Sequence, residues 1–97
     1  MKSVFITYNQ AFTERVEYML DRLEINGYTQ WTEVKGRGSE TGIPHMGTHT
    51  WPEINNALIT IVDDDKVDIL LEKIQKLNAV NEEVGIRAFV WNIERSV

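Results

Sequence analysis

Two stretches of the chain carry apolar residues at helical spacing, and strand-like runs stand before, between and after them. In residues 12–23 and again in residues 67–80, apolar side chains recur every three or four positions, as one face of a helix requires. The strand-like runs, rich in β-branched and aromatic residues, are 3–8, 28–35, 57–62 and 86–93. The resulting β-α-β-β-α-β order predicts an α+β, ferredoxin-like fold, with both helices on one face of a four-stranded antiparallel sheet.

Local signals mark where the two helices begin and end. Asn9 and Thr13 both stand where a side chain can cap the first helix, and Gly27 stands where a left-handed residue would end it. The three aspartates at 63–65 precede the second helix, where carboxylates cap free backbone N–H groups and complement the helix dipole. We therefore expect capping, rather than metal binding, from this acidic triplet.

The chain contains no cysteine, which excludes disulfides, thiolate zinc sites, iron–sulfur clusters and a cysteine nucleophile. With 97 residues it is expected to form one domain, residues 1–97. The core of so small a domain must be held by packing alone, either within one copy or against further copies of the chain.

The charge of the chain excludes one large class of partner. Fifteen acidic and ten basic residues give a net charge of −5, and the basic residues form no cluster. Because phosphate contacts dominate nucleic-acid binding, we expect no nucleic-acid partner. No apolar run approaches the roughly 20 residues of a membrane span, and the first residues lack the pattern of a signal peptide. We expect a cytoplasmic protein that does not insert into membranes.

The strands expected at 3–8 and 86–93 carry large side chains on both faces. Two helices on one side of the sheet would cover only one of those faces. The uncovered face is either ordinary exposed apolar surface, which every protein has, or a surface buried against other subunits. We favour the second interpretation, because association would also relieve the problem of the small core.

The connection between the second and third strands, residues 37–56, is far longer than a hairpin needs. Hairpin loops usually hold about two to five residues, whereas this one has roughly 20. Glycines and prolines punctuate it, and neither a strand period nor a helix period survives. Since clear strands flank it, we expect a functional loop.

Several motifs resemble one known family. The sequence EVKGRG at residues 33–38 resembles the end of the second strand in the PII (nitrogen regulatory, GlnB-like) signal-transduction proteins, whose long loop follows Glu-Val-Lys-Gly-x-Gly. The sequence DDKVD at 64–68 resembles their Asp-Asp-Lys-Val start of the second helix, at the same place in the order of elements. GTHTWP at 47–52 and AFVWNIE at 88–94 are similar to a branch of short PII-like proteins encoded beside heavy-metal efflux transporters.

This resemblance implies a homotrimer with ligand sites in the clefts between subunits. In PII proteins the loop base and a segment before the last strand hold an adenine nucleotide. The matching residues here are Lys35, Gly36, Arg37, Gly38 and Arg87. The two glycines would let the backbone approach an anion, and the basic residues beside them add positive charge. Most glycines of the segment before the last strand are missing, so both an adenine nucleotide and another anionic ligand stay open.

The only two histidines, His45 and His49, lie in the long loop. With Met46 between them they could ligate copper, nickel or zinc, and Glu40 or Glu53 could complete the site. The alternative is that they are ordinary polar loop residues. A divalent transition metal held by these histidines, in a trimer of the copper-tolerance (CutA) type, is therefore a second hypothesis.

The loop also holds a tryptophan, Trp51, directly before Pro52. An exposed tryptophan on a loop is a good anchor for a pocket in a partner protein. It could instead fold back onto the sheet edge near Trp31. Both interpretations remain open from the sequence.

The chain carries none of the local motifs by which enzymes are recognised, such as a nucleophile elbow, a Walker loop or His-Glu-x-x-His. We therefore expect a regulatory trimer and not an enzyme. The resemblance implies that it binds a nucleotide-like anion or a metal ion near the loop base. It further implies that the 37–56 loop acts on a partner, either a membrane transporter or a regulated enzyme.

Overall fold

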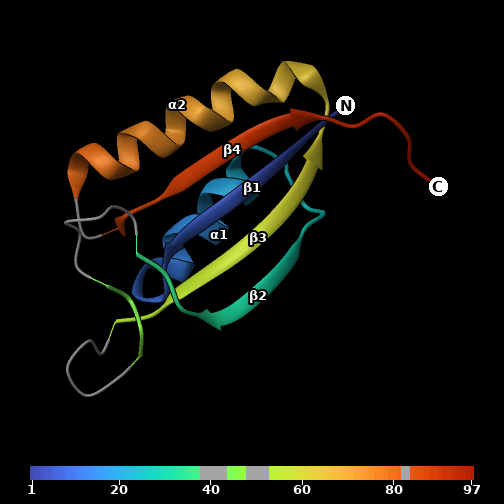
Figure 1. The fold of residues 1–97 in the computed structure, drawn as a ribbon. Coiled ribbons are helices and arrows are strands. Elements are labelled where there is room, and N and C mark those ends of the chain that lie inside the picture. The colour runs from blue at the N-terminus through green and yellow to red at the C-terminus, as the bar shows by residue number, and fades with distance from the viewer. Residues whose placement is uncertain (38–43, 48–52, 82–83) are drawn as a thin grey trace.

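The computed structural model describes residues 1–37, 44–47, 53–81 and 84–97 of the chain (Figure 1). These described residues form four strands and two helices in the predicted order, with a short 3-10 turn, Gln10–Phe12, ahead of the first helix. The elements are β1 Lys2–Asn9, α1 Thr13–Arg22, β2 Thr29–Val34, β3 Asn55–Val62, α2 Asp64–Val80 and β4 Arg87–Asn92.

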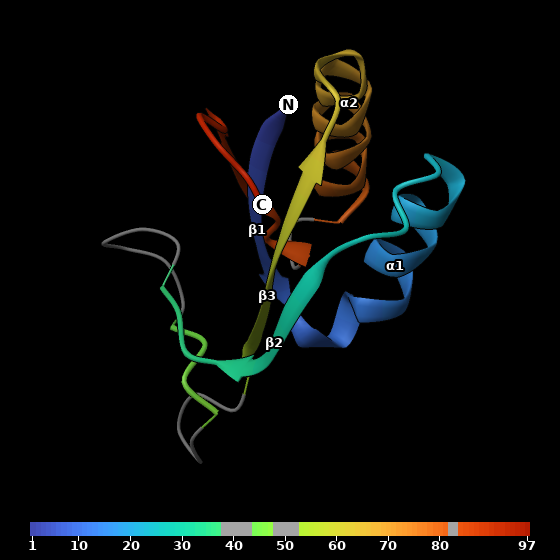
Figure 2. The ribbon, with the colours of Figure 1, turned by 90° about the vertical axis from the view of Figure 1, so that its right-hand side faces the viewer.

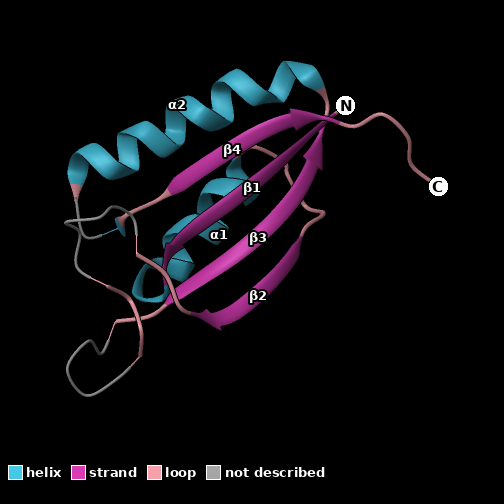
Figure 3. Ribbon diagram, viewed as in Figure 1, coloured by secondary structure: helices cyan, strands magenta, loops and turns pink. Residues whose placement is uncertain are grey.

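The strands form one sheet in the order β2-β3-β1-β4, and each adjacent pair is antiparallel (Figure 3). Both helices lie on the same side of this sheet (Figure 2). The predicted α+β, ferredoxin-like arrangement is confirmed.

The core lies between the sheet and the helices, because every second residue of the central strands points toward the helices. Val4, Ile6 and Tyr8 of β1 are fully buried there. Each helix adds an apolar stripe to the same cluster. Its buried members on the helices are Val16, Met19, Leu20, Leu70 and Ile74.

The other face of the sheet is apolar and uncovered. Four large side chains on it are about half exposed: Trp31 46%, Ile61 45%, Phe89 51% and Trp91 48%. Phe5 of β1 extends this apolar surface across the middle of the sheet, since it is paired with Phe89 on one side and with Ile59 on the other. The prediction that both sheet faces carry large side chains is confirmed. We call this surface the open face.

The predicted end of the first helix is wrong. Glu24, not Gly27, adopts the left-handed conformation, with φ +59°. The N–H of Ile25 donates to the carbonyl of Leu20 at 2.9 Å. This is the 6→1 hydrogen bond of a Schellman motif, which commonly ends a helix. Ile25 is buried, so its packing decides where the chain turns, and this outweighs the preference of glycine for the turn.

The predicted caps are right only in part. The Asn9 side chain accepts the N–H of Ala11 at 3.0 Å and so caps the 3-10 turn ahead of α1. Asp63 is the residue before α2, but its carboxylate makes no capping bond. Asp64 pairs instead with the amino group of Met1 at 3.0 Å, because that group lies beside the start of the helix.

Neither helix in the described ranges combines the length and the apolarity that crossing a bilayer requires.

Candidate functional site

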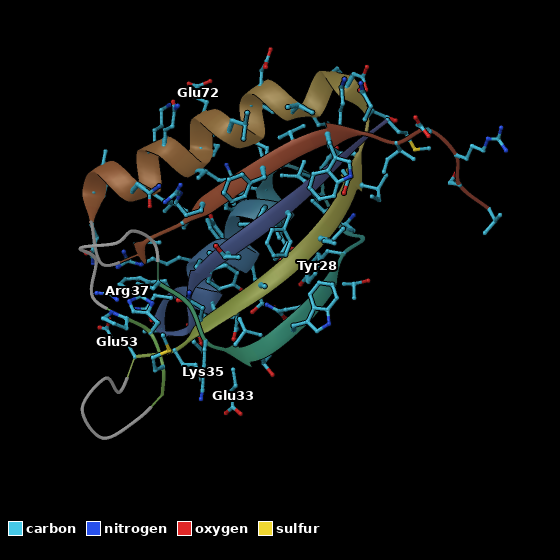
Figure 4. The ribbon with its side chains drawn as sticks, in the orientation of Figure 1. Tyr28, Glu33, Lys35, Arg37, Glu53 and Glu72 are labelled. Atoms are coloured by element: carbon cyan, nitrogen blue, oxygen red, sulfur yellow. The ribbon has the colours of Figure 1, made fainter. Side chains whose placement is uncertain are left out.

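The second strand bends at its end, and this bend directs the chain out of the sheet. The register between β2 and β3 shifts between Trp31 and Val34, and Glu33 there has φ +57°. The displaced backbone N–H of Glu33 donates to the side-chain oxygen of Asn56 at 3.2 Å. Figure 4 shows Glu33 and Lys35 projecting from this end of the strand. A bulge of this kind re-aims the residues that follow it.

Beyond the bulge, the two sides of the loop are joined at Gly36 and His45. The N–H of Gly36 donates to the carbonyl of His45 at 2.9 Å, and the N–H of His45 donates back at 2.6 Å. A Cβ atom on Gly36 would lie 2.5 Å from the side-chain nitrogen of Asn55, so only glycine fits without rearrangement. We call Lys35, Gly36, Arg37, His45 and Glu53 the loop base.

The bridge changes the role expected for Gly36. Its backbone N–H was expected to face an anion, but it already donates a hydrogen bond to the carbonyl of His45. Gly36 therefore serves to let two segments of the same chain approach each other closely. The basic side chains on either side of it, Lys35 and Arg37, are exposed.

His45 ties the loop base to the start of β3. Its Nδ1 atom lies 2.5 Å from the side-chain oxygen of Asn55, and its Nε2 atom lies 3.1 Å from a carboxylate oxygen of Glu53. Both ring nitrogens are thus engaged within the chain, and a metal ion would have to displace one of these partners. Among the residues that the structure describes, no three His, Cys, Asp or Glu side chains gather as a metal site would require.

A second network, which no pattern in the sequence predicted, holds the end of β2 to the start of α1. The Asn56 side chain, almost fully buried, donates to the hydroxyl of Thr13 at 3.0 Å while accepting from Glu33. Thr13 in turn donates to the carbonyl of Gln10 at 2.6 Å. Two adjacent asparagines at the start of an otherwise apolar strand were the available signal. Alternation along the strand sends Asn55 toward His45 and Asn56 toward the helix.

Arg87 comes from another part of the chain. It is the first residue of β4, is paired with Thr7 of β1, and has its guanidinium 5.8 Å from the centroid of the Phe89 ring. Side chains two residues apart point the same way, so Arg87 shares the open face with Phe89. The start of the strand is fixed by Asn78, whose side chain makes two hydrogen bonds of 2.9 Å to the backbone of Ile86.

The predicted ligand residues are therefore spread over two elements. Lys35, Gly36 and Arg37 lie together at the loop base, and Arg87 lies at the start of β4. In Figure 2 the loop base extends to the side of the sheet that carries no helix, which is the side that Arg87 shares. Cations on that side of the sheet suit an anionic ligand. Gly38, His49 and Trp51 lie outside the described residues.

Comparison with known proteins connects this architecture to one family. The whole chain, residues 1–97, matches the family model described as nitrogen regulatory protein P-II. No curated protein sequence matches at a significant level.

Solved structures agree with the family match. CPII, a nitrogen regulatory PII-like protein from Thiomonas intermedia K12 bound to ADP and bicarbonate, is 27% identical with a TM-score of 0.75, covering 95% of this chain and 84% of that chain. A further CPII structure, bound to ADP, AMP and bicarbonate, is 26% identical with a TM-score of 0.75 over the same shares. A PII-like signalling protein from Thermus thermophilus is 24% identical with a TM-score of 0.67, covering 95% of this chain and 85% of that chain.

Proposed function

The chain belongs to the nitrogen regulatory protein P-II family, and from that premise we propose that it is a homotrimeric signalling protein that binds an adenine nucleotide at the loop base. The bound nucleotide selects one conformation of the 37–56 loop, and that loop acts on a partner protein. An effector shifts such an equilibrium only if it binds the two loop conformations with different affinity. The protein therefore works by binding, without catalysis, and its expected place is the cytoplasm.

The observation that carries this proposal is the bridge between Gly36 and His45. It fixes the otherwise long connection at one point and holds Lys35 and Arg37 on either side of a tight backbone crossing. A ligand that contacts these two side chains therefore touches the point from which the rest of the loop departs. This is the arrangement that a ligand-controlled loop requires.

The nature of the effector follows from charge and from similar proteins. Lysine and arginine side chains recognise phosphate oxygens through charge-assisted hydrogen bonds. CPII, which is 26–27% identical in two of its structures, is described with ADP, AMP and bicarbonate bound. We assign the phosphates to Lys35, Arg37, Gly38 and Arg87, and we regard bicarbonate as a candidate second ligand.

The open face supports the homotrimer. Trp31, Ile61, Phe89 and Trp91 leave a large apolar surface on the side of the sheet without helices. Exposed patches of this kind mark association surfaces, and further copies of the same chain would cover this one. Association would also bury additional apolar surface, which a chain this short cannot bury in its own core.

The proposed partner is a protein that contacts the 37–56 loop. A membrane transporter or a regulated enzyme, contacted through the 37–56 loop with Trp51 as an anchor, is the hypothesis that the family resemblance supplies. Tryptophan is among the residues that dominate binding energy at protein interfaces.

Isothermal titration calorimetry with ADP, AMP and ATP, with and without bicarbonate, tests the proposed effector. We expect binding of at least one nucleotide, and a loss of roughly tenfold or more in affinity for Arg87→Ala, because a charge-assisted hydrogen bond contributes about 1.5–3 kcal/mol. Arg95→Ala, an exposed arginine beyond β4, is the matched control and should bind as the wild type does. Absence of binding by all three nucleotides would remove the sensor role.

A further inference from the structure

A groove runs between the two helices, on the side of the molecule opposite the open face. It has a volume of about 400 Å³ and is open along its outer side. Its apolar lining comprises Met19, which is buried, Leu23 and Leu77, which are half-buried, and Tyr18 and Val80, which are exposed. We call the first three the floor of the groove and the last two its walls. Figure 2 shows α1 and α2 apart from each other on one side of the sheet, with the loop base on the opposite side.

The walls of the groove leave apolar surface in water. Val80 is one of the apolar residues that recur at helical spacing in 67–80, and this pattern predicts that it is buried. In the structure 79% of Val80 is exposed. Tyr18, on the facing helix, is 63% exposed. Neither side chain belongs to the core cluster. The stripe of apolar residues on each helix therefore continues past the core and onto the groove.

The rim of the groove is basic although the chain is acidic. Its cations are Arg15, Arg22, Lys73 and Lys76. These are four of the ten basic residues in a chain of net charge −5. Among the described residues, the lining contains no Asp or Glu, and the one recorded ion pair at the rim joins Lys76 to Glu72 at 3.3 Å.

The spacing of these residues matches a helical partner. On α1, Arg15, Met19 and Arg22 follow one another at steps of four and three, and α2 repeats the same steps with Lys73, Leu77 and Val80. Each stripe spans two helical turns, about 10 Å. Two ridges of this length with an apolar floor between them accept the convex apolar face of a third helix, as in other helix-in-groove complexes.

We propose that this groove is a second docking surface, which binds an amphipathic helix of a partner protein whose apolar stripe is flanked by Asp and Glu. The apolar stripe of the partner packs on Met19, Leu23 and Leu77, and its carboxylates face the basic rim. A concave groove favours a helix over a membrane surface, because a flat bilayer would touch the rim but not the floor. The surface is separate from the loop base, so it can be occupied whether or not a nucleotide is bound.

Selection from a display library of helical peptides, randomised along one face, tests this proposal. We expect the peptides that bind the full chain to share an i, i+3, i+4, i+7 apolar stripe flanked by acidic residues. Measured by fluorescence anisotropy, the selected peptides should bind Lys73→Glu at least about tenfold more weakly, since one close charge pair is lost and a repulsion is gained. Their binding should also weaken as salt is raised.

Two matched variants separate the groove from general effects of charge or apolar loss. Arg95→Glu reverses a charge beyond β4, and Ile69→Asp alters an exposed apolar residue of α2 that does not line the groove. Both should bind the peptides as the wild type does, whereas Val80→Asp should not. Circular dichroism confirms that each variant is folded.

The proposal is overturned if no peptide is enriched, if the enriched peptides lack acidic residues, or if Lys73→Glu binds them as tightly as the wild type. It is also overturned if the wild type binds vesicles of anionic phospholipid, loses that binding on Lys73→Glu, and binds no acidic helix. Since no step involves a nucleotide, these results are independent of the proposed effector.

Discussion

The Nε2 atom of His45 lies 3.1 Å from a carboxylate oxygen of Glu53, so this imidazole is held to the residues just before β3. His45 is largely buried, with 18% of its side chain exposed, while Glu53 is 46% exposed. The same imidazole contacts Asn55 through its other nitrogen. One side chain thus holds this part of the long connection to the start of β3 and to the residue just before it.

Removing this side chain should loosen the loop base. We expect His45→Ala to lower the free energy of unfolding by about 1–2 kcal/mol, since a hydrogen bond contributes about 1 kcal/mol and a partly exposed pair less. Limited proteolysis should cut within 37–56 faster than in the wild type. Glu53→Gln keeps an acceptor for the imidazole and should lose less stability. Equal urea denaturation and proteolysis for His45→Ala and the wild type would contradict this role.

A substitution at Gly36 should disturb the same region through sterics alone. Because the Cβ of Gly36→Ala would lie 2.5 Å from the Asn55 side-chain nitrogen, that side chain must move away from its contact with His45. We expect a loss of about 1–3 kcal/mol, the usual cost of overpacking. Gly27→Ala is the control, since nothing lies within 4 Å of its Cβ position. Thermal denaturation of both variants tests this prediction. Equal melting temperatures for Gly36→Ala and Gly27→Ala would exclude the steric explanation.

Removing the Asn56 side chain should lower the free energy of unfolding, because this buried side chain makes two hydrogen bonds. Asn56→Ala leaves the N–H of Glu33 without its acceptor and removes the donor to Thr13. An unpaired buried polar group costs about 1–3 kcal/mol, so we expect a loss in that range by urea denaturation. Asn56→Asp keeps the acceptor for Glu33 and should be intermediate at neutral pH. A variant as stable as the wild type would show that water replaces these bonds.

The order of elements could be predicted from the sequence because period and strand composition are local signals. For the loop base, the sequence predicted its place in the chain but not the contacts between its residues. The motif at 33–38 identified Lys35 and Arg37 as candidates, but the partners of His45 lie eight and ten residues further along the chain, beyond a stretch whose sequence has neither a helix nor a strand period. No periodicity encodes such contacts. The left-handed residue at the end of α1 was misplaced for a similar reason, since the burial of Ile25 decides it.

Tyr28 should make the protein less stable at alkaline pH. Burial, and then the nearby Glu17 carboxylate, raise the pKa of Tyr28 above its ordinary value of 10.0. The folded state therefore holds this proton more tightly than the unfolded state. Its contribution is fully present below pH 10 and is lost as the pH rises through the folded-state pKa.

The variant Tyr28→Phe should remove that part of the pH dependence. We expect its free energy of unfolding to fall less between about pH 8 and about pH 11 than that of the wild type. At neutral pH the two should differ by less than about 1 kcal/mol, since the bond from the Tyr28 hydroxyl to Glu17 is long, at 3.4 Å. Parallel alkaline profiles of the two proteins would argue against a raised pKa.

If the proposed trimer forms through the open face, a charge placed there should break it while leaving the subunit folded. Trp91 is 48% exposed and is paired with Ser3, so it does not contribute to the core between sheet and helices. Burial of a tryptophan at the centre of an interface is worth about 2 kcal/mol or more, and Trp91→Lys both loses this and places a charge in an apolar contact. We expect light scattering at micromolar concentration to change from the mass of three chains to that of one. Ile69→Lys introduces the same charge at a similarly exposed position on α2, on the opposite side of the sheet, and should leave the trimer intact. If both variants remain trimeric, the subunits associate through a surface other than the open face, and the exposed aromatic residues need another explanation.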